Sequence, residues 1–432
     1  MLKPTAGALA LGLAAALAAS APAAAQQKEF KVGVIYDLTG AYAAGGSQAA
    51  AIGTQIAIDM INERGGVEGY KIVAINADAQ SKTEVAINEA ERLLNDEKVD
   101  MLMGFFSSAH CVPVAAKVDA AKKFMWMNVC VASAVLKDKN LKYAFRGQVH
   151  SDQFGEASCK FVAEIAQSKL GKDVKDVRVA IVHEDGPYGA GVAKGNKETC
   201  SALGLNIVHE EGYAATATDL SALITKLRRA RPDVILHTGY NPDITLFLRQ
   251  AKEAGLKWKA LIGHGAGWAQ IDKLRETFGK DVDYLFNVDP VAAQLLDPKT
   301  LAPGLGEVIQ EMVKRYKEQT GVNEVPTHAS QGFNQSWYFF TDVLPRAIKK
   351  YGGTDPEALR QAALDTDIPE GGTVQGYGVK FNPPGHPMAG QNARSFPVVM
   401  QYIGGETKIA WPNSIKTIDP VIPLPAGHTY AP

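Results

Sequence analysis

The sequence lacks an excess of charge of either sign. Its 432 residues contain 45 Lys and Arg against 46 Asp and Glu, a formal net charge of -1, and no basic tract occurs. Because nucleic acids and acidic membranes attract proteins through clustered positive charge, the composition predicts no nucleic-acid partner. Hydrophobic residues make up 46% of the chain. This content allows a large globular core, and the length predicts two or three structural units.

Motifs of catalysis and metal binding are also missing. The chain has no P-loop, no H-E-x-x-H and no G-x-S-x-G, and its nine His form no paired ligand motif. The segment "LIGHGAG" (261–267) carries only part of a dinucleotide fingerprint. His110 stands beside Cys111, but no third group is evident that would orient a nucleophile and its base. We therefore predict that the protein is not an enzyme, binds no metal and needs no cofactor.

Long hydrophobic runs are absent beyond the N-terminus. No later segment reaches the roughly 18 apolar residues that a membrane helix needs. The first residues combine Lys3, a run of Ala, Gly and Leu from Ala6 to Ala19, and small residues up to Ala25. This order is typical of a secretory signal peptide, here residues 1–25. No Cys follows the run, so we expect a protein without a lipid anchor that is exported to the periplasm.

Alternating strand-like and helix-like segments fill the rest of the chain. Phe30–Tyr36 and Lys71–Ala77 are rich in β-formers, and Ile52, Ile56 and Met60 between them fall on one helical stripe. The alternation restarts after about residue 150. Such alternation predicts βαβ units and parallel sheets with covered faces. The predicted fold class is therefore α/β with two lobes, each a parallel-sheet sandwich, and a cleft between the lobes.

Two serines stand where a buried strand is expected to end. In "MLMGFFSSAHCVPVAAK" (101–117) an apolar run stops at Ser107 and Ser108, and a helical pattern follows. The first amides of a helix have no internal partner and carry its positive dipole end, so with two hydroxyls they suit a carboxylate. Simple capping of the helix by serine is the alternative interpretation.

Other expected strand ends carry polar or aromatic side chains. The next strand ends in "NVCVAS", which places Cys130 and Ser133 at the same sheet edge. In the second unit Tyr188 and Tyr240 each follow a strand. A lone Tyr belongs most often to core or surface, but two at equivalent strand ends favour a binding site.

The joint order of these segments resembles a known family. It is similar to the type I periplasmic binding proteins that serve ABC importers of branched-chain amino acids, amides and small aromatic acids. The segments that carry the resemblance are "VGVIYDLTGAYAAGGSQAAAIGTQIAIDMINERGGVEGYKI", "MGFFSSAHCVPVA", "VAIVHEDGPYGAG", "TDLSALITKLRRARPDVILHTGYNPDITLFLRQAKEAGLK" and "FNPPGHPMAGQN". The resemblance implies a solute-capture protein that closes like a hinge and acts as a monomer with a membrane permease.

The resemblance also implies a division of the chain. Lobe one would comprise residues 26–147 and 288–375, and lobe two residues 148–287 and 376–432. The three crossings between the lobes are expected near Gly147, Asn287 and Gly376.

Site residues are implied in the same way. The positions that match the ligand-binding loops of the family, or lie in them, are Tyr42, Phe106, Ser107, Ser108, Cys130, Ala132, Ser133, Tyr188, Tyr240 and His264. Ser108 matches the serine that holds the ligand carboxylate, and the two Tyr match residues that close over the ligand from lobe two.

One departure from the family pattern bears on the ligand. Amino-acid-binding relatives place an acidic residue in the loop after the "LIG" strand, where this chain has His264. A buried ammonium without a carboxylate would cost several kcal/mol, and Asp185 and Asp243 do not match that position. We therefore expect a small carboxylate without an amino group, aromatic above all. A branched-chain or polar amino acid is the alternative ligand, and a sensory module that presents its ligand to a receptor is the alternative role.

The four cysteines are expected to form at least one disulfide, because export permits it. Cys159 and Cys200 are the favoured pair, since both are placed on helices of lobe two. Cys111 and Cys130 lie at neighbouring strand ends and are interpreted as possible ligand-lining thiols.

Overall fold

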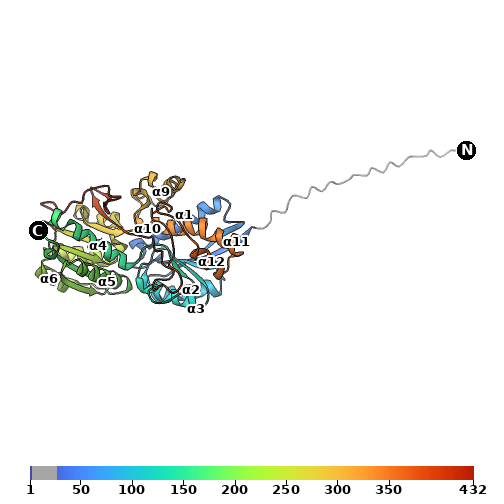
Figure 1. Ribbon diagram of the computed structural model, residues 1–432, viewed down its shortest axis with the longest axis horizontal. Coiled ribbons are helices and arrows are strands. Elements are labelled where there is room, and N and C mark those ends of the chain that lie inside the picture. Colours follow the sequence, from blue (N-terminus) through green and yellow to red (C-terminus); the bar gives the residue numbers. More distant parts are fainter. Residues whose placement is uncertain (2–26) are drawn as a thin grey trace.

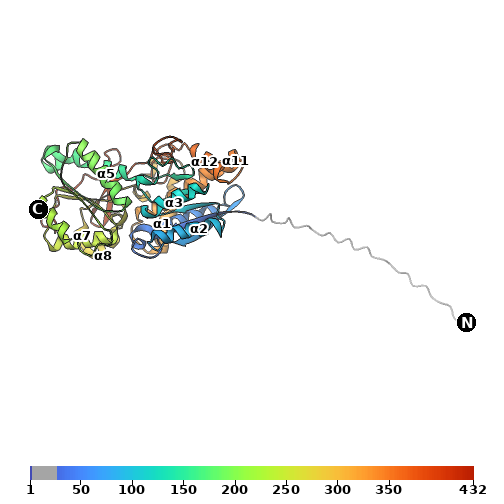
Figure 2. The same cartoon turned by 90° about the horizontal axis from the view of Figure 1, so that it is seen from below.

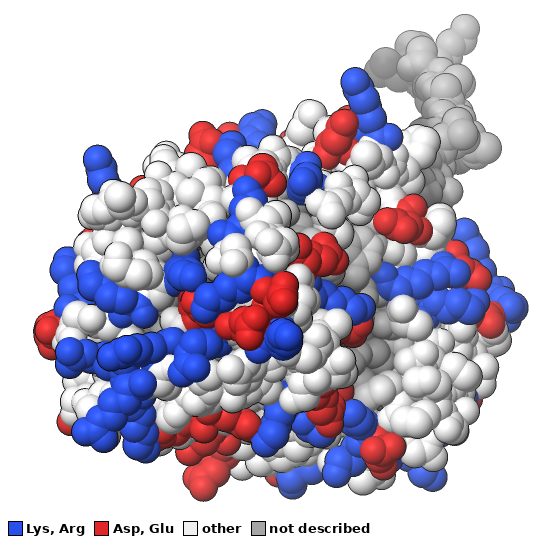
Figure 3. Space-filling view, turned by 60° about the vertical axis from the view of Figure 1, so that its left-hand side comes forward, with Lys and Arg blue, Asp and Glu red and all other residues white. Residues whose placement is uncertain are grey.

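The computed structural model describes Met1 and residues 27–432, so the predicted signal peptide falls almost wholly outside the described residues. Two lobes lie side by side in both views of the ribbon (Figures 1 and 2). In residues 27–432 no helix has both the length and the apolar character needed to cross a membrane. Figure 3 shows Lys and Arg interspersed with Asp and Glu over one face, as the balanced composition predicts.

Lobe one is built on a parallel sheet with strand order β2-β1-β3-β4-β5. Its central strand β3 is buried along its whole length, which explains why the sequence "MLMG" carries no polar side chain. The strands are β1 (Lys28–Tyr36), β2 (Tyr70–Asp78), β3 (Met101–Gly104), β4 (Phe124–Met127) and β5 (Ala144–Arg146). The helices are α1 (Gln48–Glu63), α2 (Thr83–Asn95), α3 (Ser108–Ala120), α9 (Leu305–Thr320), α10 (Thr327–Tyr338), α11 (Leu344–Tyr351) and α12 (Pro356–Leu364).

Lobe two is built on a mixed sheet with strand order β12-β11-β10-β9-β8-β6-β7. In this sheet β11 runs antiparallel to both of its neighbours, β10 and β12. The strands are β6 (Arg178–Glu184), β7 (Asn206–Tyr213), β8 (Val234–Thr238), β9 (Ala260–His264), β10 (Phe286–Asp289), β11 (Val398–Ile403) and β12 (Glu406–Trp411). The helices are α4 (Ser151–Ile165), α5 (Pro187–Ala202), α6 (Ser221–Ala230), α7 (Asn241–Glu253) and α8 (Ile271–Phe278). The expected α/β class with two lobes is confirmed.

Close helix contacts hold the late helix α10 against α1. A Cβ on Gly53 would lie 2.1 Å from the carbonyl oxygen of Ala329, and one on Gly332 would lie 2.1 Å from that of Ala50. Glycine is therefore required at both positions of this crossing, since any side chain would push the helices apart. All residues of α10 are buried, and the packing places its first turn beside the cleft.

The third crossing lies later in the chain than expected. The segment after Gly376 stays with lobe one, where Gln391 pairs with Arg146 and Phe381 packs on Phe145 with ring centroids 5.2 Å apart. The chain reaches lobe two only at β11. The boundary expected at Gly376 is corrected for this reason: Gly376, with φ +80°, makes a turn within lobe one, and the apolar contacts of Phe381 keep the following residues there.

Candidate functional site

A cavity of about 320 Å³, including its opening, lies between the lobes. Its walls combine aromatic and aliphatic side chains with a few polar groups. The lining residues are Phe106, Ser108, Val129, Val131, Phe154, Tyr188, Tyr240, Gly265, Ala266, Asp289, His328 and Gln331. The two lobes contribute equally, so the cavity depends on their contact.

One end of the cavity, the donor end, is lined by Ser108 and Val131, and Ser107 and the rest of the loop 130–132 adjoin them in the chain. Ser108 begins α3, and its Oγ accepts hydrogen bonds from the N–H groups of Val131 (3.2 Å) and Ala132 (3.0 Å). A hydroxyl has two acceptor positions and one donor. Both acceptor positions of Ser108 are therefore filled, and its O–H remains to donate to an acceptor such as a carboxylate.

Ser107 occupies the N-cap position of α3 but makes no capping hydrogen bond with its side chain. Its Oγ is buried and has no partner among the described residues. A buried hydroxyl without a partner is costly. The capping interpretation of the two serines is therefore not supported by the geometry, and Ser107 keeps an unused hydroxyl next to Ser108 in the chain, although it does not line the cavity.

A disulfide and a buried cation hold the donor end in place. Cys111 of α3 is bonded to Cys130, so the interpretation of these residues as free thiols is wrong, and Cys130 contributes to the site by fixing the loop. Arg146 is fully buried, and its Nη1 donates to the carbonyls of Cys130 (3.3 Å) and Ala132 (2.8 Å). Burial lowers the pKa of Arg146 to about 9, which leaves it positive at neutral pH. The expected pair Cys159–Cys200 is confirmed.

Arg146 has no carboxylate partner within the part of the chain that is described. Its remaining contact is a hydrogen bond from Nε to Oε1 of Gln391, at 2.6 Å. A positive charge thus lies unpaired directly behind the loop that forms the donor end. A buried charge without a partner favours an opposite charge nearby.

Aromatic side chains from both lobes cover the cavity. The ring of Tyr240 lies 5.4 Å from Tyr188 and 6.2 Å from Phe106, between centroids. Tyr42 of lobe one is not a lining residue, but it packs on the outer side of Tyr240 with ring centroids 4.3 Å apart. These contacts join lobe one to lobe two across the cavity.

Six of the ten expected site residues do not line the cavity, namely Tyr42, Ser107, Cys130, Ala132, Ser133 and His264. The side chain of His264 is buried inside lobe two, where Nδ1 is 2.9 Å from Oγ1 of Thr238 and Nε2 is 3.1 Å from Oγ of Ser158. Burial lowers its pKa to about 3, so it is neutral. Only its carbonyl serves the site, by accepting a hydrogen bond from the hydroxyl of Tyr188. Ser133 faces the hinge, where its Oγ donates to Asp152 at 2.7 Å.

The opposite end of the cavity, the acceptor end, is formed by Asp289 and Gln331. Nε2 of Gln331 in α10 donates to Oδ1 of Asp289 at the end of β10, at 2.8 Å. Oδ2 of Asp289 and Oε1 of Gln331 have no hydrogen-bond partner among the described residues, although each side chain is only 1% exposed. Burial raises the pKa of Asp289 well above its usual range. Two unused acceptors at one place suit a donor with positive charge.

The acceptor end was missed by the sequence reasoning, which looked for an acid in the loop after β9. A polar residue at the end of an apolar strand was visible in "FNVDP", where Asp289 ends the strand. The same pattern had pointed to Ser107. The two acids considered as substitutes lie elsewhere. Asp185 is exposed, and Asp243 is satisfied by the hydroxyl of Tyr213 (2.6 Å) and the N–H of Tyr240 (2.9 Å).

Two lobes around a polar-ended apolar cavity define a solute-binding protein of the hinged type. The family model described as "Periplasmic binding protein" matches residues 29–395, and the chain belongs to this family. It is 33% identical over 407 residues to Leu/Ile/Val-binding protein homolog 7 of Brucella suis, covering 94% of this chain and 96% of the relative. The relative is named as a binding protein rather than as an enzyme.

Solved structures have the same fold. The branched-chain amino acid transporter substrate-binding protein LivJ of Streptococcus pneumoniae, in complex with isoleucine, is 20% identical with a TM-score of 0.70, over 89% of this chain and all of that one. A fatty acid ABC transporter substrate-binding protein of Thermomonospora curvata is 19% identical with a TM-score of 0.71, over 91% of this chain and 95% of that one. The family membership makes this chain a periplasmic binding protein, and the solved structures show that its fold is the one these proteins share.

Proposed function

We propose that the protein captures an α-amino acid with an apolar side chain and delivers it to an ABC permease. The observation that carries this proposal is the unpaired carboxylate of Asp289, buried in the cavity beside an unused acceptor of Gln331. An ammonium group has three donors and a positive charge. It would satisfy both acceptors and neutralise Asp289.

The donor end supports the other half of an amino acid. The O–H of Ser108 is left to donate, Ser107 Oγ is unused, and Arg146 carries a positive charge behind the loop. A carboxylate at this end would pair with these groups. A zwitterion therefore complements both ends at once, which a carboxylic acid without an amino group does not.

This proposal replaces the deaminated aromatic acid expected from the loop at His264. Such a ligand would leave the carboxylate of Asp289 buried without a partner, at a cost of several kcal/mol if ionised. The apolar walls favour an apolar side chain such as that of leucine or isoleucine, since burial of apolar area contributes about 25 cal/mol per Å².

The remaining parts of the proposal follow from the family. We infer that residues 1–25 are removed on export to the periplasm, that the protein acts as a monomer, and that ligand closes the lobes by stabilising contacts made only in the closed form. Small-angle scattering checks the closure: the radius of gyration is expected to fall when ligand is added to saturation.

Titration of matched ligand pairs tests the proposed ligand class. Calorimetry on the mature protein would compare leucine with 4-methyl-2-oxopentanoate and phenylalanine with phenylpyruvate. Loss of one partner from a buried charge pair costs about 2–5 kcal/mol, so leucine should bind at least about thirtyfold more tightly than its oxo acid. Equal or tighter binding of the oxo acid would contradict the role of Asp289. It would favour a carboxylic acid without an amino group as the ligand.

A further inference from the structure

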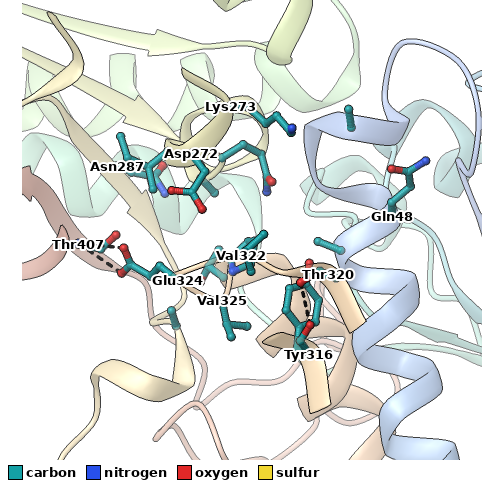
Figure 4. Close-up of a pocket in the computed structure, with 18 of the residues that line it drawn as sticks. Gln48, Asp272, Lys273, Asn287, Tyr316, Thr320, Val322, Glu324, Val325 and Thr407 are labelled. Carbon is teal, nitrogen blue, oxygen red and sulfur yellow. Dashed lines mark hydrogen bonds between the residues drawn. The ribbon is translucent and has the colours of Figure 1, made fainter. Parts of the chain in front are cut away.

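A second chamber lies between the lobes, beside the first cavity. It has a volume of about 990 Å³ including its opening. The wall between the two spaces contains the hydrogen bond between Nε2 of Gln270 and Nδ1 of His328, at 3.1 Å, since Gln270 lines the chamber and His328 lines the cavity. Figure 4 shows Gln48, Tyr316 and Thr320 on one side of the chamber and Asp272, Asn287 and Glu324 on the other.

Two carboxylates face this chamber without a cationic partner. Within the described residues, neither Asp272 nor Glu324 forms an ion pair with Lys or Arg, and Glu324 accepts only long hydrogen bonds of 3.3 Å from the N–H of Thr407. The one Lys in the lining, Lys273, has its Nζ 3.1 Å from Glu276. Burial raises the pKa of both acids, and Asp272 raises that of Glu324 further.

An unpartnered buried amide lines the same chamber. Asn287 is 1% exposed, its Oδ1 accepts the N–H of Gly265 at 2.8 Å, and its Nδ2 has no partner among the described residues. A buried donor without an acceptor is costly, so the chamber offers a donor beside its two carboxylates. Apolar side chains complete the lining, namely Ile52, Val322, Val325 and Met400.

The two carboxylates and the amide of the chamber favour an organic ammonium ion over a metal ion. Among the described residues no group of three or more His, Cys, Asp or Glu is arranged to hold a metal ion. An organic ammonium ion needs fewer ligands and gains from the apolar walls. The Nδ2 of Asn287 requires an acceptor, which a hydroxyl on the same molecule provides.

The geometry points to a second binding site in this chamber for a small aliphatic amine that carries a hydroxyl group. The ammonium group lies between Asp272 and Glu324, and the hydroxyl oxygen accepts from Asn287. Since both lobes line the chamber, its occupant favours the closed form. The site uses none of the groups at the donor and acceptor ends, so it does not rest on the proposed function.

Calorimetry with an isosteric pair of probes tests this site. Into the mature protein we would titrate 4-aminobutan-1-ol and, separately, butane-1,4-diol, which replaces the ammonium by a hydroxyl. The amine is expected to bind and the diol to give no measurable heat. In the double variant Asp272→Asn, Glu324→Gln the amine should bind about tenfold more weakly, because two partly buried charge pairs are lost.

Two further variants separate binding in the chamber from a general effect of surface charge and from binding in the first cavity. Glu318→Gln removes one negative charge from the exposed side of α9, close to the chamber but outside it, and should leave amine binding unchanged. Amine binding should persist in Asp289→Asn, whose change lies in the first cavity. The proposal is overturned if the diol binds as well as the amine, or if no amine binds up to about 10 mM. It is equally overturned if binding survives the double variant but is lost in Asp289→Asn, which would place the amine in the first cavity.

Discussion

The two ends of the ligand cavity are built in different ways. The donor end comes from two short segments of lobe one, 107–108 and 130–132, which are joined by the Cys111–Cys130 disulfide and by hydrogen bonds to Ser108. The acceptor end joins Asp289 of lobe two to Gln331 of lobe one. The donor end therefore lies within one lobe, whereas the acceptor end joins residues of the two lobes.

This difference assigns different tasks to the two ends. A preformed donor end can receive a carboxylate in the open protein without reorganisation. The acceptor end joins the two lobes, so an ammonium ion bound there would favour the arrangement in which the lobes are in contact. The comparison predicts that changes at the acceptor end weaken both affinity and closure, and that changes at the donor end weaken affinity alone.

The largest effect is expected from Asp289→Asn. This variant keeps the shape of the side chain and removes its charge, so the ligand ammonium loses its only carboxylate in the cavity. Leucine binding should weaken by about 2–5 kcal/mol, or roughly 30-fold to several thousandfold. Calorimetry measures it, with the exposed Asp185→Asn as the matched control that should bind as the wild type does. Unchanged affinity in Asp289→Asn would show that the acceptor end does not bind the ligand.

A smaller effect is expected at the donor end from Ser108→Ala. Loss of one hydrogen bond to a charged group costs about 1.5–3 kcal/mol, or one to two decades in affinity. The loop 130–132 should stay in place because the disulfide and Arg146 still hold it. Scattering should still show closure at saturating ligand. If affinity is unaltered with the fold intact, Ser108 only supports the loop.

The affinity should depend on pH through the acceptor end. Burial raises the pKa of Asp289 above the usual value of about 3.9. As the pH falls through this raised pKa, the carboxyl gains a proton and can no longer pair with an ammonium ion. Leucine should therefore bind more weakly in the wild type as the pH falls through this range, because only the ionised carboxyl pairs with the ammonium group. The same titration in Asp289→Asn should be flat, and a parallel slope in both proteins would assign the pH effect to another group.

The smallest effect is on the stability of the ligand-free protein. A carboxyl whose pKa is raised by folding stabilises the fold at low pH, and this contribution is lost as the pH rises through the folded pKa. Asp289→Asn removes the ionisable group, so without ligand it should be more stable than the wild type near pH 8, by about 1 kcal/mol. The gain should vanish near pH 4. Thermal unfolding at both pH values measures the difference, and lower stability of the variant at pH 8 would contradict the cost assigned to Asp289.

Much of the fold and half of the site were accessible from local pattern. Strand–helix alternation predicted the α/β lobes because hydrophobic period depends only on neighbouring residues. The helix start at Ser107 and Ser108 was visible for the same reason, since a strand end and a helix start lie within a few residues of each other. The pair Cys159–Cys200 followed from the placement of both residues on helices of one lobe.

Tertiary structure alone decided the rest. Asp289 and Gln331 are 42 residues apart and meet because β10 ends at the cleft while α10 packs on α1 through Gly53 and Gly332. The position of the third crossing depends on where Phe381 finds its apolar contacts, and the inward burial of His264 depends on Thr238 and Ser158. Sequence periodicity records which face of an element is apolar. It does not record which distant element covers that face, and the acceptor end of the cavity arises at such a contact.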